Sequence, residues 1–290
     1  MSGARFDVPG VDLDLVARSH GWYDLAPFEW DEERRTLSFV FLADGAPERV
    51  ALSARNGGVR VAATAPVRLA RPVVARVLDL GSELGPFHAL CAERRGEGFG
   101  WIADRRAGRV LRAPTLFEDA VKVLCTTNCS WALTRSMVTR MVAAFGRGGA
   151  FPDAAFLAAL PEQRLRDELK LGYRAPFLRE FATRVAGGAL DLAAWEDAAL
   201  PDDELAARIR AEKGFGPYAA ETLLRLLGRH GRLGLDSWSR KQVARLRFRG
   251  RAVKDVRVAR FYAPFGRYAG LAFWLDVTRD WHEGRESLWP

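Results

Sequence analysis

Two hydrophobic periodicities divide the sequence. Between residues 35 and 65, β-branched and aromatic residues alternate with polar ones in RTLSFVFLAD and ERVALSARNGGVRVAATA. A period of two is typical of half-buried strands, and the NGG at 56–58 is a hairpin signal. We therefore expect residues 1–71 to form an antiparallel β-sheet domain.

From about residue 72 the hydrophobic residues recur at helical spacing. Leu133, Met137 and Met141 recur every four residues in a helix predicted from about 131 to 145. Thr115 and Glu118 have the spacing of a capping box at the start of the preceding helix. The fold class expected is therefore α+β, with a mainly helical region over residues 72–290. Further helices are predicted over 153–160, 162–170, 176–187, 191–198 and 202–211.

The stretch KGFGPYAAETLLRLLGRHGRLGLDSW, residues 213–238, predicts a tight corner between two helices. Gly214-Phe215-Gly216 is the turn, and Pro217 opens the second helix, which gives a helix–hairpin–helix over residues 202–229. The N–H groups of such a turn, with the positive end of the following helix, form a site for a phosphate. An ordinary helical corner capped by glycine is the alternative. Phe215 is expected to be buried between the two helices.

Asp236 follows this helix pair, directly before another predicted helix. An aspartate is favoured as the N-cap of a helix, which is one interpretation. The other is a carboxylate beside a DNA groove, where it stabilises a sugar cation and directs a water molecule.

The net charge of +8 and the pI of about 9.8 favour a polyanionic partner such as nucleic acid. The first residues, MSGARFDVPGVDLDL, lack the pattern of a secretory signal, and no apolar run approaches the roughly 18 residues of a membrane span. Three cysteines fit a reducing cytoplasm and are too few for an iron–sulfur cluster. We expect a cytoplasmic protein without a metal centre, whose cysteines are buried structural thiols.

Several motifs together resemble the helix–hairpin–helix DNA glycosylases. Gly214, Gly216, Ala219 and Asp236 match the family's hairpin and its catalytic aspartate. VLCTTNCSWALTRSMVTRMVAAFG and KLGYRAPFL are similar to segments of the 8-oxoguanine glycosylases. The resemblance implies base excision repair, in which a damaged nucleotide is flipped from duplex DNA and its N-glycosidic bond is cleaved. It also implies a monomer associated with the nucleoid. No cofactor is expected, with the one exception of a monovalent cation at the hairpin.

The resemblance assigns three further residues to DNA binding. Asn128 would occupy the space left by the flipped nucleotide, Tyr173 would wedge into the base stack, and Arg174 would approach the orphaned base. A helix cap, an aromatic at the edge of the core and a surface charge are the respective alternatives.

Tyr218 occupies the position at which bifunctional family members carry a Schiff-base lysine. A phenol cannot form an imine, and Lys213 lies on the other side of the hairpin, so we expect a monofunctional enzyme without lyase activity. Tyr218 and Trp238 are predicted to line the base pocket, although Tyr218 could equally serve packing.

Two departures from the family pattern disfavour 8-oxoguanine as the substrate. Leu133 replaces an arginine that would read the opposing cytosine, and Leu25 replaces a glycine whose carbonyl would read the oxidised purine. An alkylated purine in an aromatic pocket is the first expectation. Excision of 8-oxoguanine or a mispaired base is the alternative, and so is non-catalytic binding of damaged or bent DNA. The aromatic candidates for the pocket are Trp22, Phe28, Trp238, Phe273 and Trp274.

Overall fold

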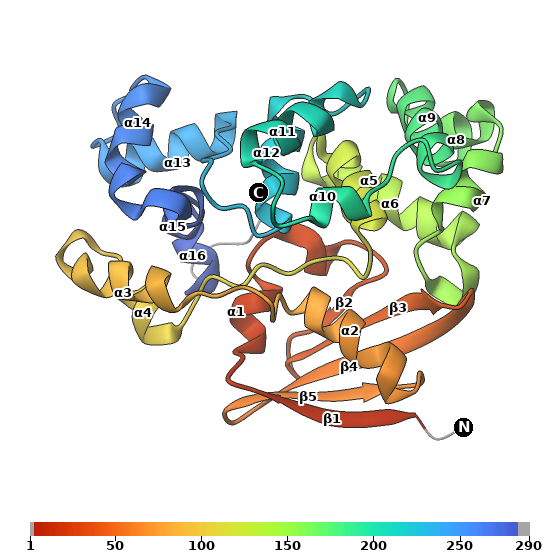
Figure 1. Ribbon diagram of the computed structural model, residues 1–290, viewed down its shortest axis with the longest axis horizontal. Coiled ribbons are helices and arrows are strands. Elements are labelled where there is room, and N and C mark those ends of the chain that lie inside the picture. Colours follow the sequence, from red (N-terminus) through yellow and green to blue (C-terminus); the bar gives the residue numbers. More distant parts are fainter. Residues whose placement is uncertain (1–2, 284–290) are drawn as a thin grey trace.

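The computed structural model describes residues 3–283 and has a layer of helices above one antiparallel sheet (Figure 1). The five strands of the sheet are ordered β1-β5-β4-β3-β2. The expected α+β class is therefore confirmed. The strands are β1 (Ala4–Pro9), β2 (Glu29–Asp31), β3 (Thr36–Ala43), β4 (Ala46–Arg55) and β5 (Gly58–Ala63).

Alternation fixes which face of the sheet is buried. Leu37 pairs with Leu52, and Phe39 pairs with Val50, and all four side chains lie in the core. The hairpin expected at NGG is confirmed, because β4 and β5 are adjacent and Arg55 pairs with Gly58. The edge strand β1, which pairs with β5, was not predicted.

Of the first four helices, one lies between β1 and β2 in the chain, and the other three follow β5. They are α1 (Leu13–Ala17), α2 (Val67–Val77), α3 (Gly85–Glu93) and α4 (Gly100–Arg105). The boundary expected between residues 71 and 72 falls inside α2. This helix begins at Val67, after only three residues that follow the end of β5 at Ala63. Residues 284–290 of the expected helical region lie outside the described residues.

Of the remaining helices, those up to residue 226 follow the predicted ranges to within a few residues, and no range was predicted for those after Asp236. Thr115 caps the first of them, since its hydroxyl accepts a hydrogen bond from the Glu118 N–H at 3.2 Å. They are α5 (Leu116–Thr126), α6 (Trp131–Phe145), α7 (Ala154–Ala159), α8 (Glu162–Glu168), α9 (Arg174–Ala186), α10 (Ala193–Glu196), α11 (Asp202–Ala211), α12 (Pro217–Leu226), α13 (Ser237–Arg247), α14 (Asp255–Tyr262), α15 (Ala269–Val277) and α16 (Arg279–His282).

The central helix α5 packs against α6, α9 and α12, and a buried carboxylate ties it to the N-terminal region. Asp119 accepts hydrogen bonds from the Trp22 indole at 2.8 Å and the Ala113 N–H at 2.9 Å, and it pairs with Arg76 at 2.9 Å. Because every oxygen of this fully buried group is satisfied, the position of α5 is fixed relative to the sheet. Within the described residues, no helix combines the length and the apolar character needed to cross a membrane.

Candidate active site

A cleft of about 1070 Å³ opens where the α5–α6 turn, the start of α9, the α11–α12 hairpin and the start of α13 meet. These four segments are far apart in the sequence. Of the nine residues assigned to catalysis, to DNA binding or, as Tyr218 and Trp238 are, to the base pocket, all but Arg174 line this cleft. The lining residues from that set are Asn128, Tyr173, Gly214, Phe215, Gly216, Tyr218, Asp236 and Trp238.

The hairpin between α11 and α12 needs glycine at its first position. Gly214 has a φ of +88°, and a Cβ there would lie 2.7 Å from Leu124. Phe215 is buried, as expected, with its ring 5.0 Å from that of Phe181. Gly216 is exposed, and its carbonyl accepts the first backbone bond of α12, from Ala220 at 3.0 Å. The earlier N–H groups of α12 have no intrahelical acceptor, which is the arrangement that binds a phosphate.

Asp236 is the N-cap of α13 and also lines the cleft. Its Oδ1 accepts a hydrogen bond from the Ser239 N–H at 2.7 Å, and its own N–H donates to the Ser239 hydroxyl at 2.9 Å. The capping role is therefore confirmed, but it engages one carboxylate oxygen. Within residues 3–283, Oδ2 accepts no hydrogen bond. The cap thus fixes the carboxyl group and leaves one oxygen for a ligand.

Tyr218 and Trp238 line the same cleft as Asp236. Burial, followed by the nearby Asp236 carboxylate, raises the pKa of the Tyr218 hydroxyl, so this phenol is neutral at physiological pH. Trp238 is stacked on Trp281, with ring centroids 5.0 Å apart, and Trp274 lies 6.3 Å away. The tryptophan at the cleft is thus supported by a packed aromatic cluster.

Asn128 lies in the turn between α5 and α6, with an exposed side chain and a φ of +47°. Asparagine tolerates this left-handed conformation better than most residues. Ser130, not Asn128, caps α6, because its hydroxyl accepts a hydrogen bond from the Leu133 N–H at 3.3 Å. The Asn128 amide has no hydrogen-bond partner in the described chain and is available to a ligand at the cleft.

Tyr173 and Arg174 differ in their access to the cleft. Tyr173 is 49% exposed, and its ring lies edge-on to Phe177 at 6.2 Å. Arg174 is buried, donates a hydrogen bond to the Thr127 carbonyl, and holds its guanidinium 4.5 Å from the centre of the Tyr173 ring. Arg174 itself does not line the cleft, because its guanidinium lies against the Tyr173 ring and the Thr127 carbonyl, and its contact with an orphaned base stays a prediction.

Arg225 is a residue near the site that the sequence analysis did not single out. It is buried on α12, seven residues after Tyr218 and so on the same helical face, and its guanidinium lies 4.1 Å from the Trp274 ring centre. Burial lowers the pKa of Arg225 to about 10, opposed by Tyr218 and Asp236, so it remains a cation at neutral pH. An arginine on the apolar face of an amphipathic helix was the signal that could have revealed it.

The remaining aromatic candidates for the pocket belong to the core. Trp22, Phe28 and Phe273 are buried and do not line the cleft. These aromatic side chains pack in the interior, where a flipped base cannot reach them.

The cysteines are free, as expected, but one of them is not a core residue. Burial raises the pKa of Cys91 and Cys125 to about 12, so both are thiols. Cys129 is half-buried and lines the cleft, with its thiol donating to the Cys125 carbonyl at 3.0 Å. Among the described residues, no cluster of three or more His, Cys, Asp or Glu side chains could hold a metal ion. A monovalent cation at the hairpin stays a prediction.

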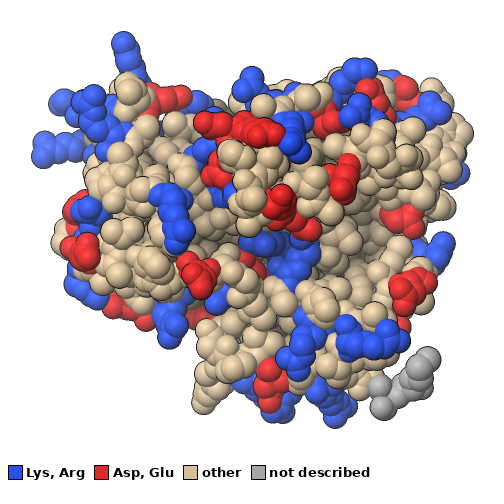
Figure 2. Space-filling view, in the orientation of Figure 1, with Lys and Arg blue, Asp and Glu red and all other residues tan. Residues whose placement is uncertain are grey.

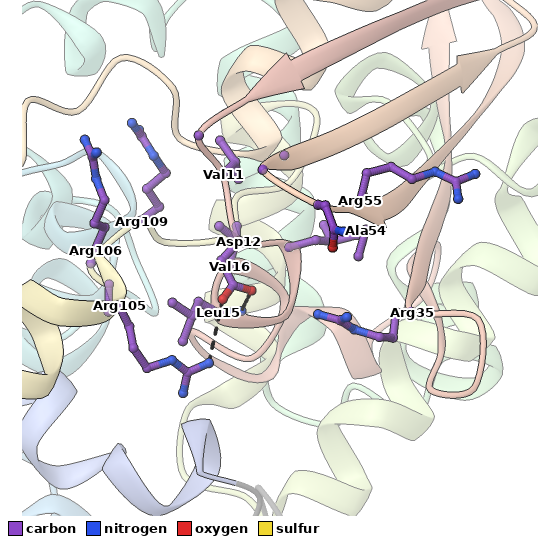
Figure 3. Close-up of a pocket in the computed structure, with 17 residues that line it drawn as sticks. Val11, Asp12, Leu15, Val16, Arg35, Ala54, Arg55, Arg105, Arg106 and Arg109 are labelled. Atoms are coloured by element: carbon purple, nitrogen blue, oxygen red, sulfur yellow. Dashed lines mark hydrogen bonds and ion pairs between the residues drawn. The ribbon is translucent and has the colours of Figure 1, made fainter.

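A second hollow, of about 720 Å³, lies between the start of α1, the β4–β5 turn and residues 105–109 (Figure 3). Arg105, Arg106 and Arg109 stand on one side of Asp12, with Arg35 and Arg55 on the other. None of the residues predicted for the site lies here, and its one carboxylate, Asp12, faces Arg105 at 3.7 Å. The cleft at Asp236 is therefore the candidate active site.

Neither family models nor curated proteins match this sequence. Solved structures match the fold along nearly its whole length. A 3-methyladenine DNA-glycosylase from Archaeoglobus fulgidus superposes with a TM-score of 0.78 at 19% identity, covering 96% of this chain and 98% of its own. A structure of MBOgg1 in complex with a low-affinity DNA ligand has a TM-score of 0.77 at 17% identity, covering 97% of both chains. The chain has the fold of the helix–hairpin–helix DNA glycosylases.

The same glycosylase fold occurs in an 8-oxoguanine glycosylase/lyase from Clostridium acetobutylicum, in complex with double-stranded DNA containing cytosine opposite 8-oxoguanine. Its TM-score is 0.67 at 18% identity, over 92% of this chain and 93% of the other. The shared glycosylase fold thus spans proteins named for two different lesions. The fold therefore does not distinguish between these lesions, and the choice of substrate depends on the side chains that line the cleft.

Proposed function

We propose that the protein is a monofunctional DNA N-glycosylase of base excision repair, which flips a damaged purine out of duplex DNA and hydrolyses its N-glycosidic bond. The observation that carries the proposal is Asp236. Its carboxylate is fixed by its cap, its Oδ2 accepts no hydrogen bond from a described residue, and it lines the cleft beside the hairpin. A protein that only binds DNA has no need for a carboxylate in a groove that accepts phosphates.

Each part of the cleft has a role in this reaction. The N–H groups after Gly216 hold a backbone phosphate. Asn128 and Tyr173, both available at the cleft, fill the gap left by the extruded nucleotide and replace its lost stacking. Together they hold the duplex in the kinked form that presents one nucleotide to Asp236.

The chemical step is a hydrolysis at the sugar C1′. The bond between C1′ and the base nitrogen breaks, and the base leaves with the electron pair. Asp236 stabilises the positive charge that develops on the sugar and accepts a proton from the attacking water. Water supplies the new C1′–O bond, and a proton returns to the departing base, so the products are a free base and an abasic site.

The identity of residue 218 argues against lyase activity, because a tyrosine stands where a Schiff-base lysine would be needed. Its neutral hydroxyl cannot form the imine through which a lysine would cleave the strand. Lys213, the nearest alternative in sequence, forms an ion pair with Glu180 at 2.9 Å. Water remains the nucleophile.

An alkylated purine is the first substrate to test. Trp238 offers the aromatic surface that an electron-poor base prefers, and it is held in place by Trp281. Leu133, 40% exposed on α6, offers no hydrogen bond to an opposing cytosine. The second candidate is 8-oxoguanine or a mispaired base, since proteins named for 8-oxoguanine share the fold.

A panel of duplexes tests the proposal. The protein is incubated with DNA carrying an alkylpurine, 8-oxoguanine, hypoxanthine, uracil or mismatched adenine, and abasic sites are then cleaved with hot alkali. Alkali-dependent cleavage is expected with the alkylpurine. Cleavage confined to 8-oxoguanine or adenine duplexes selects the second candidate. Tight binding of a lesion without cleavage of any duplex would replace the enzyme with a binding protein.

A further inference from the structure

A strongly basic segment follows Asp236 along the chain. Residues 240–260, RKQVARLRFRGRAVKDVRVAR, contain nine arginines and lysines and one acidic residue, Asp255. Figure 2 shows Lys and Arg side chains gathered over α13 and α14, at the upper left of the molecule. The segment includes α13, the loop 248–254 and α14.

Most of these charges have no acidic partner among the described residues. Arg240, Arg245 and Arg247 form ion pairs with Asp255, Asp280 and Asp276. The other six are exposed, and no side chain among them forms a hydrogen bond or an ion pair with any residue from 3 to 283. These six define the basic patch: Lys241, Arg249, Arg251, Lys254, Arg257 and Arg260.

Like charges gathered on α13, the loop 248–254 and α14 repel one another, so the patch is complementary to an anion that spans it. Its loop has a defined shape, because Arg249 and Gly250 both adopt left-handed conformations, with φ of +53° and +76°. Guanidinium groups match the oxygens of a phosphate with two parallel hydrogen bonds. A row of phosphates is the ligand that suits such a surface.

The helix α13 sets the distance between the patch and the cleft. It starts at Asp236 and runs for 11 residues, which at 1.5 Å per residue is about 16 Å. Its far end leads into the loop that carries Arg249, Arg251 and Lys254. With 3.4 Å between successive base pairs, this length corresponds to about five base pairs of duplex.

We propose that the basic patch binds the phosphate backbone of the DNA that flanks the lesion, about five base pairs away from it. This inference rests on the proposed function, since the cleft defines where the lesion lies. The patch adds affinity without reading sequence, because phosphate contacts position the duplex and carry no base information. The bound length of DNA therefore extends beyond the hairpin, on the side towards which α13 points.

An anionic membrane surface is the other occupant to test, because Val256 is 65% exposed and Leu246 is 39% exposed among these charges. The three loop charges are removed in R249Q/R251Q/K254Q. The matched control, R5Q/R55Q/R68Q, removes three exposed charges from β1, β4 and α2, none of which forms an ion pair with a residue that the structure describes. Both variants lose the same net charge.

Binding of undamaged duplexes of about 8 and about 24 base pairs is measured by fluorescence anisotropy over a range of salt concentrations. We expect the loop variant to bind the long duplex about 10- to 100-fold more weakly than wild type, and to lose about two to three units of salt slope. The short duplex extends only about four base pairs to either side when the hairpin holds its middle, so the loop variant should weaken it much less than the long one. The control variant should remain near wild type for both lengths.

Two results would overturn the proposal. One is equal weakening of the long duplex by both variants, which would reduce the effect to net charge. The other is loss of binding to phosphatidylserine vesicles by the loop variant while its duplex binding stays intact, which would assign the patch to membranes. Since undamaged DNA is used, a wild type that excises no lesion would contradict the proposed function without changing these measurements.

Discussion

The carboxylate of Asp236 is shared between a helix cap and a cleft. Ser239 engages Oδ1, and the reciprocal bond from the Asp236 N–H completes the capping box. A cap residue is held in one rotamer, so the free oxygen is fixed in direction before any ligand arrives. Asparagine caps helices about as well as aspartate. Asp236→Asn should therefore remove the charge while preserving α13.

Tyr218 yields a prediction at the same scale. Because its raised pKa keeps the phenol neutral and no lysine replaces it, the wild-type protein should form no covalent intermediate with its substrate. Sodium borohydride added during excision should trap no protein–DNA complex on a denaturing gel, while free abasic product accumulates. A trapped complex would show that an amine of this protein attacks the sugar.

At the scale of elements, the hairpin between α11 and α12 distinguishes its two glycines. Gly214→Ala forces a Cβ to within 2.7 Å of Leu124 at a φ of +88°, whereas a Cβ at Gly216 meets nothing within 4 Å. We expect Gly214→Ala to lower the free energy of unfolding by about 1–3 kcal/mol and to weaken DNA binding. Urea unfolding checks the first effect. Gly216→Ala should unfold within about 1 kcal/mol of wild type, and equal losses would contradict this assignment.

Elements with local signals were predictable from the sequence. The hairpin at 56–58, the cap at Thr115 and the helix opened by Pro217 each follow from residues within one turn of the feature. The strand β1 was missed although ARFDVP alternates apolar and polar residues, because the run is only six residues long and its pairing with β5 joins residues 49 to 59 positions apart. Tertiary pairing, which no local pattern encodes, decided that element.

The same distinction applies to the site. Asn128, Tyr173, Tyr218 and Asp236 were found through motifs, and the structure brings them to one cleft. The burial of Arg174 and the stacking of Arg225 on Trp274 depend on how α9, α12 and α15 meet. Such packing cannot be read from residue type, because arginine is far more often exposed than buried.

At the scale of the whole molecule, a buried histidine couples stability to pH. His230 is 6% exposed, and neither ring nitrogen has a hydrogen-bond partner among the described residues. Burial lowers its pKa from 6.5 to about 3, so the neutral form is the one that folds. Above pH 6.5 the imidazole is neutral in the folded and the unfolded protein. As the pH falls from 6.5 towards 3, the unfolded chain binds a proton that the folded protein does not, so the free energy of unfolding falls.

His230→Phe removes this titration without removing a hydrogen bond. Relative to wild type, the variant should gain about 2 kcal/mol of unfolding free energy when the pH is lowered from 7 to 5. Other titrating groups, such as Glu118, whose pKa burial raises to about 7, cancel in this difference. Urea unfolding at both pH values provides the measurement. Parallel pH profiles for the two proteins would show that His230 is hydrated or paired.

The central claim, that Asp236 performs the chemistry in this cleft, is tested most directly by single-turnover excision with Asp236→Asn on the lesion that wild type excises. The variant should bind the lesion duplex as wild type does, since the cap and the hairpin persist, while its excision rate falls by about 10²–10³-fold or more. An excision rate equal to that of wild type would contradict the account.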